Sequence, residues 1–125
     1  MADKEIHSII IALGTNTEHE HNINKALCLL DDIVFDIKYS RKLWTSPIGI
    51  MSDMFLNMLV SGRCNLTLPE LCNVIKSIET KCGRLDDDKK RGIVKIDIDI
   101  LQYDNQKEHA DDWQRKYIKT LIKEL

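Results

Sequence analysis

Residues 93–101 read Ile-Val-Lys-Ile-Asp-Ile-Asp-Ile-Leu, the clearest alternation of apolar and polar side chains in the chain. Successive side chains of a β-strand point to opposite faces of its sheet, so this stretch predicts a strand. The apolar residues at positions 94, 96, 98 and 100 would fill the core face, while Asp97 and Asp99 project from the other face. Two residues of strand rise would place these carboxylates about 6.5–7 Å apart.

The paired aspartates carry the sharpest functional signal. Two carboxylates at this separation repel each other unless a cation lies between or beside them. Oxygen ligands of this kind suit Mg²⁺ that also binds phosphate groups. The pattern therefore predicts a metal site for a nucleotide at Asp97 and Asp99. The alternative is a solvated sheet face on which the aspartates pair with Lys95.

Three other segments have the pattern of strands. Residues 7–13 form a short apolar run rich in β-branched side chains, which is typical of a buried central strand. Residues 35–44 alternate between apolar and polar side chains, and residues 54–64 resume as a further strand after a turn. The chain thus supplies four strands in all.

Three helices separate or follow these strands. Apolar residues recur at helical spacing from Asn22 onward, with Asn22 or Asn24 as the cap. The tetrapeptide Thr67-Leu68-Pro69-Glu70 is a capping box that opens a second helix, which ends near Gly83. A third amphipathic helix is expected from His109. The order predicts an α+β, ferredoxin-like βαββαβ antiparallel sheet with helices on one face and an added C-terminal helix.

Composition is consistent with a single domain over residues 1–125 and excludes several function classes. The net charge of −2 argues against nucleic-acid binding, which needs a basic surface. No apolar run approaches the length of a membrane span, and residues 1–5 show no leader, so we expect a cytoplasmic protein. The four cysteines form no C-x-x-C pair, so we expect reduced thiols. Nothing in the sequence indicates an oligomeric state.

Candidate phosphate ligands lie between the second helix and the aspartate strand. Arg84 and the run Lys89-Lys90-Arg91 could bind phosphate groups, or they could form a solvated turn balanced by the aspartates at 86–88. Glu79 lies near the negative end of the helix dipole, where a carboxylate is mildly unfavourable. It is either a site residue or simply exposed.

A second group of residues could bind a flat heterocycle. Phe55 and Asn57 project from one face of their strand, so an aromatic ring and an amide would point the same way. Thr45, Pro47 and Ile48 lie in the loop just before this strand. The alternative is that Phe55 belongs to the core and Asn57 to the sheet edge.

Taken in order, several of these segments resemble the 6-hydroxymethyl-7,8-dihydropterin pyrophosphokinase family over about residues 7–104. Gly14-Thr15-Asn16 stands where the family has G-S-N, and residues 44–49 are similar to its Y-x-T-x-P-[LI]-G loop. Phe55-Leu56-Asn57 is similar to its aromatic-x-Asn. Ile78-Glu79 with Gly83-Arg84 matches I-E-x-x-x-G-R, and residues 96–101 match its D-[IL]-D-[IL]-[IL] strand.

The resemblance implies transfer of pyrophosphate from ATP to 6-hydroxymethyl-7,8-dihydropterin in folate biosynthesis, with AMP as the other product. It implies two Mg²⁺ ions held with ATP by Asp97 and Asp99. The implied catalytic residues are Arg84, Arg91, Asp97 and Asp99. The implied pterin ligands are Thr45, Pro47, Ile48, Phe55 and Asn57. The implied nucleotide ligands are Glu79, Arg84, Lys89, Lys90, Arg91 and Ile100.

The sequence also departs from the family pattern. The family has an R-W-x-x-R run before the aspartate strand. In this chain Arg91 occupies the position of the Trp, and Val94 occupies the position of the last Arg. The tail, residues 109–125, has no V-P-H-P segment, so we expect part of the pterin stack and several nucleotide contacts to be absent. One hypothesis is slow transfer in which the loop cations at 89–91 partly replace the missing ones. The alternative is a catalytically weak or inactive module that binds pterin or nucleotide. An RNA-binding domain with the same order of elements is disfavoured, because the predicted strands lack the exposed aromatic side chains that would stack on bases.

Overall fold

The central strand of the sheet is β1 (His7–Thr15). It belongs to a computed structural model that describes residues 5–47 and 53–125, with the side chain of Lys89 left outside the description. β1 pairs antiparallel with β4 (Phe55–Cys64) on one side and with β5 (Asp97–Tyr103) on the other. Because β1 is covered by packed elements on both faces, it is apolar along most of its length, as predicted.

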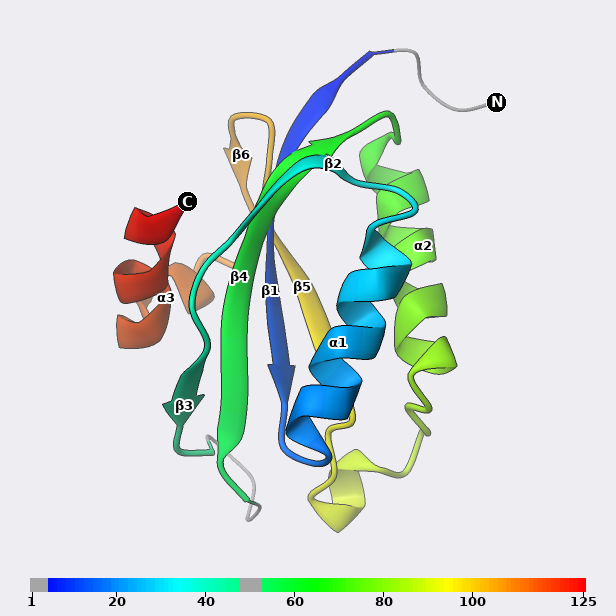
Figure 1. Cartoon of the computed structure of the whole chain (residues 1–125), viewed down its shortest axis with the longest axis vertical. Helices are drawn as coiled ribbons and strands as arrows, with labels where there is room; N and C mark the ends of the chain where they lie inside the picture. Colours follow the sequence, from blue (N-terminus) through cyan, green and yellow to red (C-terminus); the bar gives the residue numbers. More distant parts are fainter. Residues whose placement is uncertain (1–4, 48–52) are drawn as a thin grey trace.

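The remaining strands extend this sheet outward. β2 (Phe35–Tyr39) and β3 (Leu43–Thr45) both pair with β4, and β6 (Gln106–Lys107) pairs with β5. Over the described ranges the sheet has six strands in the order β2-β4-β1-β5-β6, with β3 beside β4. This antiparallel order is that of the βαββαβ motif, and it confirms the predicted fold class (Figure 1).

Two helices cover one face of the sheet: α1 (His19–Leu30) and α2 (Leu68–Lys81) (Figure 1). The predicted capping box opens α2, since the hydroxyl of Thr67 accepts from the N–H of Glu70 while the Glu70 carboxylate accepts from the N–H of Thr67. Gly83, with a φ of 92°, follows the end of α2. The main core lies between these helices and the sheet.

The opposite face of the sheet is partly covered by α3 (Lys116–Leu121) (Figure 1). Ile118 and Leu121 of α3 pack there on Ala12, Leu59 and Leu101. The indole N–H of Trp113 donates to the carbonyl oxygens of Leu101 and Glu108, which fastens the approach to the helix. No helix in the described ranges is long and apolar enough to cross a membrane.

The structure corrects the strand predicted over residues 35–44. The strand is interrupted after Tyr39, where the backbone N–H and the hydroxyl of Ser40 both form hydrogen bonds with β4. The Ser40 N–H donates to the Leu59 carbonyl oxygen, and its hydroxyl accepts from the Leu59 N–H at 2.8 Å. β3 begins three residues later, at Leu43.

The expected helix limits also need correction. α1 begins at His19 and not near Asn22, after Glu18 in a left-handed conformation. Asn22 therefore lies inside α1 and donates its side-chain N–H to the Thr17 carbonyl oxygen at 2.8 Å. The tail helix expected from His109 is shorter than predicted, since α3 is preceded by the 3₁₀ turn Asp112–Gln114 and followed by the 3₁₀ turn Ile122–Glu124.

The start of β1 is tied to the turn after β5 by hydrogen bonds to Asp104 that should make stability depend on pH. Asp104 bonds to the His7 ring at 2.7 Å and accepts from the Ser8 N–H at 3.0 Å. These bonds lower the pKa of Asp104, so they stabilise the fold above the ordinary aspartate pKa and are lost as the pH falls through the lower folded value. We expect Asp104→Asn to lower the melting temperature at pH 7, and we expect this difference to shrink as the pH falls below the ordinary aspartate pKa of about 4. Thermal melts across this pH range would contradict the prediction if the difference in melting temperature between the variant and the native chain stayed constant.

Candidate functional site

The strand β5 sends its side chains alternately into two different environments. Ile98 and Ile100 are buried in the core under α1 and α2, whereas Leu101 belongs to the core under α3. Asp97 and Asp99 therefore share the face of the sheet on which α3 lies. The predicted orientation of the pair is confirmed by this packing. Val94, which was expected to share the core face, instead lies before β5.

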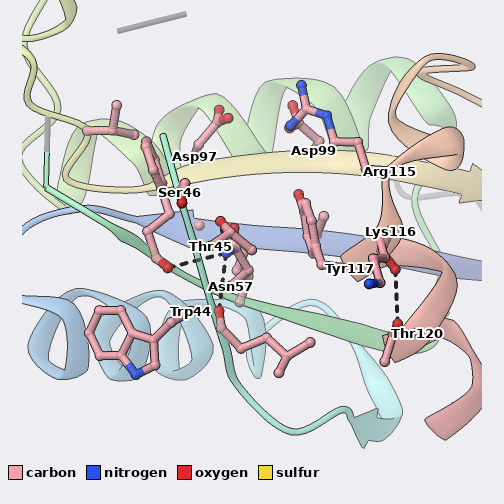
Figure 2. Close-up of a pocket in the computed structure, with 16 residues that line it drawn as sticks. Trp44, Thr45, Ser46, Asn57, Asp97, Asp99, Arg115, Lys116, Tyr117 and Thr120 are labelled. Carbon is pink, nitrogen blue, oxygen red and sulfur yellow. Dashed lines mark hydrogen bonds between the residues drawn. The ribbon is translucent and has the colours of Figure 1, made fainter. Parts of the chain in front are cut away.

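A cavity of about 620 Å³ opens on this face and brings most of the predicted pterin ligands together with the aspartates (Figure 2). β3 and β4 form one wall, β5 forms another, and the tail closes a third side. The predicted residues that line it are Thr45, Phe55, Asn57, Asp97 and Asp99. The sequence had placed these residues in three separate segments, and the strand order makes them neighbours.

The Asn57 amide is fixed by its neighbours at the floor of this cavity. Its Nδ2 donates to the Thr45 hydroxyl at 2.8 Å and to the Leu43 carbonyl oxygen at 3.2 Å. Gly14 lies opposite on β1, where a Cβ atom would come within 3.1 Å of the Asn57 Oδ1. The glycine of the Gly-Thr-Asn segment thus leaves room for the amide, which is nearly completely buried.

The two aspartates are in unequal electrostatic environments. Asp97 is the more exposed and accepts from Arg84 Nη1 at 3.3 Å. Burial, reinforced by the neighbouring Asp97 charge, raises the pKa of Asp99 to about 6. The His109 Nε2 lies 3.9 Å from the Asp99 Oδ1. Two carboxylates that raise each other's proton affinity are an arrangement in which a bound cation would relieve the repulsion.

Glu79 is a bridge between α2 and β5. Its Oε2 accepts from the Ile98 N–H at 3.0 Å and from Arg84 Nη1 at 2.8 Å. Burial is the main reason that the pKa of Glu79 is raised, and the bond from Ile98 opposes it. These contacts explain why a carboxylate lies near the end of the helix: it accepts a hydrogen bond from the backbone N–H of Ile98 in β5.

A second cavity of about 510 Å³ lies between α2 and the other side of the aspartate pair. Its walls combine apolar groups with charged ones, which suits a ligand with both a heterocycle and phosphates. Asp97 and Asp99 line this cavity as well as the first. Its other predicted residues are Glu79, Arg84 and Ile100.

The remaining predicted residues are not brought to these walls. Lys90 and Arg91 are exposed, and among the described residues neither lines either cavity. Lys89 and Arg91 bound a 3₁₀ turn, and the side chain of Lys89 lies outside the description. Pro47 adjoins the first cavity without lining it, and Ile48 lies outside the described residues.

The tail contributes a wall that sequence reasoning missed. Arg115, Lys116 and Tyr117 line the first cavity, where Tyr117 lies between the aspartates and Asn57 in Figure 2. His109 lines the second cavity. The 3₁₀ turn and α3 carry the tail back over the sheet, which the sequence did not predict. A basic residue followed by an aromatic at the start of the last helix was the available signal. The expected absence of part of the pterin stack and of several nucleotide contacts stays a prediction.

Among the described residues, no cluster of three or more His, Cys, Asp or Glu side chains is placed to hold a metal ion. Two carboxylates alone leave most positions around Mg²⁺ to water and to substrate oxygens. The donor set thus fits an ion that arrives with a phosphorylated ligand, and it does not fit a closed structural metal site.

Comparison with known proteins agrees with the geometry. The sequence matches the family described as 7,8-dihydro-6-hydroxymethylpterin-pyrophosphokinase over residues 10–125. It is 31% identical over 121 residues to a folate synthesis bifunctional protein of Arabidopsis thaliana, and 30% identical over 128 residues to a mitochondrial folate synthesis bifunctional protein of Pisum sativum. These alignments cover 88% and 94% of this chain, and the chain spans about a quarter of the length of both relatives. The chain therefore belongs to the 7,8-dihydro-6-hydroxymethylpterin-pyrophosphokinase family.

Proposed function

We propose that the protein transfers pyrophosphate from ATP to 6-hydroxymethyl-7,8-dihydropterin, as a single pyrophosphokinase-like domain over residues 1–125. The observation that carries the proposal is that Asp97 and Asp99 line both cavities. Phosphoryl groups of a nucleotide in the second cavity would meet a substrate in the first at these carboxylates. Family membership supports the same reaction. The cytoplasmic location stays a prediction.

The first cavity has the features of a pterin site. Phe55 and Tyr117 supply aromatic surfaces on different walls, and the locked Asn57 amide can accept from a ring N–H. Thr45 is held by the same amide, so its backbone is fixed for hydrogen bonding. Pro47 and Ile48 complete the proposed set from the adjoining loop.

The second cavity would take the nucleotide. Ile100 gives an apolar surface for the base, while Arg84 and Glu79 present charged groups beside Asp97. Arg91 and Lys90 would reach the phosphates only from the outside of the loop, and Lys89 stays a predicted ligand. Because Val94 stands at the last Arg of the family pattern, Arg115 and Lys116 are the better-placed replacements: both line the first cavity with Asp97 and Asp99.

Asp97 and Asp99 would hold two Mg²⁺ ions that bind with ATP. When bound, Mg²⁺ neutralises phosphate charge and stabilises the oxygen of the departing AMP. The cavity walls orient the pterin hydroxymethyl oxygen toward the β-phosphorus, and Arg84 keeps Asp97 in place. The new O–P bond forms as the bond from the β-phosphorus to the bridging oxygen breaks, AMP leaves with that oxygen, and the hydroxyl proton passes to solvent.

The test is AMP formation by purified protein with ATP, Mg²⁺ and the pterin alcohol. We expect AMP in equal amount to the pyrophosphorylated pterin, and no AMP when either the pterin or Mg²⁺ is omitted. Calorimetry under the same conditions separates the alternative function. Binding of pterin and Mg-ATP without any AMP would identify a module without turnover, and absence of binding would overturn the proposal altogether.

Tyr117 offers a sharper test of the pterin pocket. Loss of one aromatic stacking partner typically costs about 1–3 kcal/mol, so Tyr117→Ala should raise the KM for the pterin by about tenfold or more. Tyr117→Phe keeps the ring and should stay near the native value. The KM for ATP serves as the internal reference, and an equal rise in both constants would show that Tyr117 does not contact the pterin.

A further inference from the structure

The loop from Gly83 to Ile96 joins α2 to β5 and is closed by a buried ion pair that the proposed reaction does not use. Asp88 Oδ2 lies 3.4 Å from Lys95 Nζ, and the Asp88 side chain is only 4% exposed. Lys95 Nζ also donates to the Gly83 carbonyl oxygen at 2.7 Å. One ammonium group thus holds the end of α2 and the middle of the loop together.

Asp88 organises the loop through its backbone as well. Its Oδ2 accepts from the Leu85 N–H at 2.8 Å. Its carbonyl oxygen accepts from the N–H groups of Arg91 and Ile93, at 3.0 and 2.9 Å. Both sides of the 3₁₀ turn Lys89–Arg91 are therefore attached to one residue. Loss of the Asp88 carboxylate would release the Leu85 N–H and Lys95 Nζ from this contact, while the two bonds to the carbonyl oxygen would remain.

Asp88 also lines a cavity that shares residues with the proposed nucleotide site. A third cavity of about 460 Å³ is lined by Asp88 and by Glu79, Arg84, Val94 and Asp97, so the clamped loop forms its wall next to the metal-binding aspartate. Arg84, one residue after the Gly83 that Lys95 holds, is the group that contacts Asp97. The position of Lys95 is thus coupled to Asp97 through Gly83 and Arg84.

Asp88 is poorly arranged for stability alone. Its Oδ1 is buried, and within the described part of the chain it has no hydrogen-bond partner. Such an orphan acceptor costs free energy that an apolar side chain would avoid. A buried acceptor that lowers stability is expected where the residue has another role, such as holding a loop in the conformation that binds a ligand.

We infer that the Asp88–Lys95 pair is a positioning device that presents Arg84 to the nucleotide phosphates. The inference rests on the proposed function, because it assigns the adjacent cavity to ATP. Neither residue needs to touch the nucleotide. The pair keeps the loop in its binding conformation, and loss of either partner should have the same consequence.

The experiment measures the Kd of a non-hydrolysable ATP analogue with Mg²⁺ by calorimetry, on the full chain and its variants. Asp88→Asn and Lys95→Met should each weaken nucleotide binding by about tenfold, and the double variant should be no weaker than either alone, because both remove one interaction. Lys95→Arg keeps the cation and should recover most of the affinity. Lys81→Met makes the same charge change at an exposed residue in the last turn of α2 and should bind like the native chain.

The Kd for the pterin alcohol separates positioning from general damage, since it should not change in any of these variants. Equal weakening of both ligands, or additive effects of the two single changes, would overturn the inference. Native-like nucleotide affinity in Asp88→Asn and Lys95→Met would also overturn it. If the native chain binds the analogue but forms no AMP, the proposed reaction fails while the positioning role stands or falls on these affinities.

Discussion

Replacing Asp97 or Asp99 with Asn is expected to reduce pyrophosphoryl transfer by about 100- to 1000-fold. This range follows from the cost of losing one group that stabilises transition-state charge, about 3–4 kcal/mol. Each substitution removes a negative charge of the proposed metal site, where the two carboxylates are the shared wall of both cavities. The measurement is kcat for AMP formation at saturating Mg²⁺. Asp111→Asn, on an exposed residue of the tail, is the matched control.

The same substitution at Asp99 should leave the fold at least as stable as before. The pKa of Asp99 is raised to about 6, so the ionised form is disfavoured in the folded state. For a carboxyl with a raised pKa, stability is lost as the pH rises from the unfolded value of about 4 through 6. After allowance for solvent screening, this amounts to about 1 kcal/mol at pH 7.

Asp99→Asn should therefore melt at or above the native temperature at pH 7 without Mg²⁺, and the difference should vanish near pH 4. A variant that loses activity together with its fold would show that Asp99 is a structural residue. A variant that keeps both its activity and its fold would show that Asp99 is not part of the proposed metal site.

Asn16→Ala is expected to have the second largest effect, on both stability and activity. Asn16 lies just after β1 and holds the segment before β5 by three bonds. Its side chain donates to the Gly92 carbonyl oxygen at 2.9 Å and accepts from the Val94 N–H at 2.7 Å, while its backbone N–H donates to the Val94 carbonyl oxygen at 3.0 Å. The amide is 3% exposed, so its removal leaves buried backbone groups unpaired.

Two lost bonds and the unpaired groups that remain should cost about 2–4 kcal/mol of unfolding free energy. The same change should weaken nucleotide binding, because Val94 leads directly into the strand that carries Asp97. Urea denaturation gives the stability, with Asn24→Ala on the exposed side of α1 as the control. A loss below about 1 kcal/mol would show that water replaces the amide.

The sequence was sufficient to predict the elements whose pattern is local. The alternation in residues 96–101 and the capping box before α2 gave the correct element types, and the order of elements gave the sheet. The interrupted strand at Ser40 could not be foreseen, because its cause is a pair of bonds to Leu59, a residue distant in sequence. Val94 left the expected strand for a similar reason, since Asn16 takes over its backbone groups.

The candidate site was predicted where its residues lie on strands and missed where it depends on how the tail folds back. Phe55, Asn57 and Asp97 follow from the faces of β4 and β5. Tyr117 falls within the amphipathic helix expected from His109, and only the docking of α3 on the sheet shows that it lines the cavity. Distant contacts of this kind leave no periodic signal in the sequence.

The most direct test of the central claim is a crystal structure with a non-hydrolysable ATP analogue, Mg²⁺ and the pterin alcohol. We expect Mg²⁺ bound by both Asp97 and Asp99, phosphates on one side of the pair and the pterin ring beside Asn57 on the other. Phosphates bound elsewhere, with Asp97 still paired to Arg84 and no metal ion on either carboxylate, would contradict it.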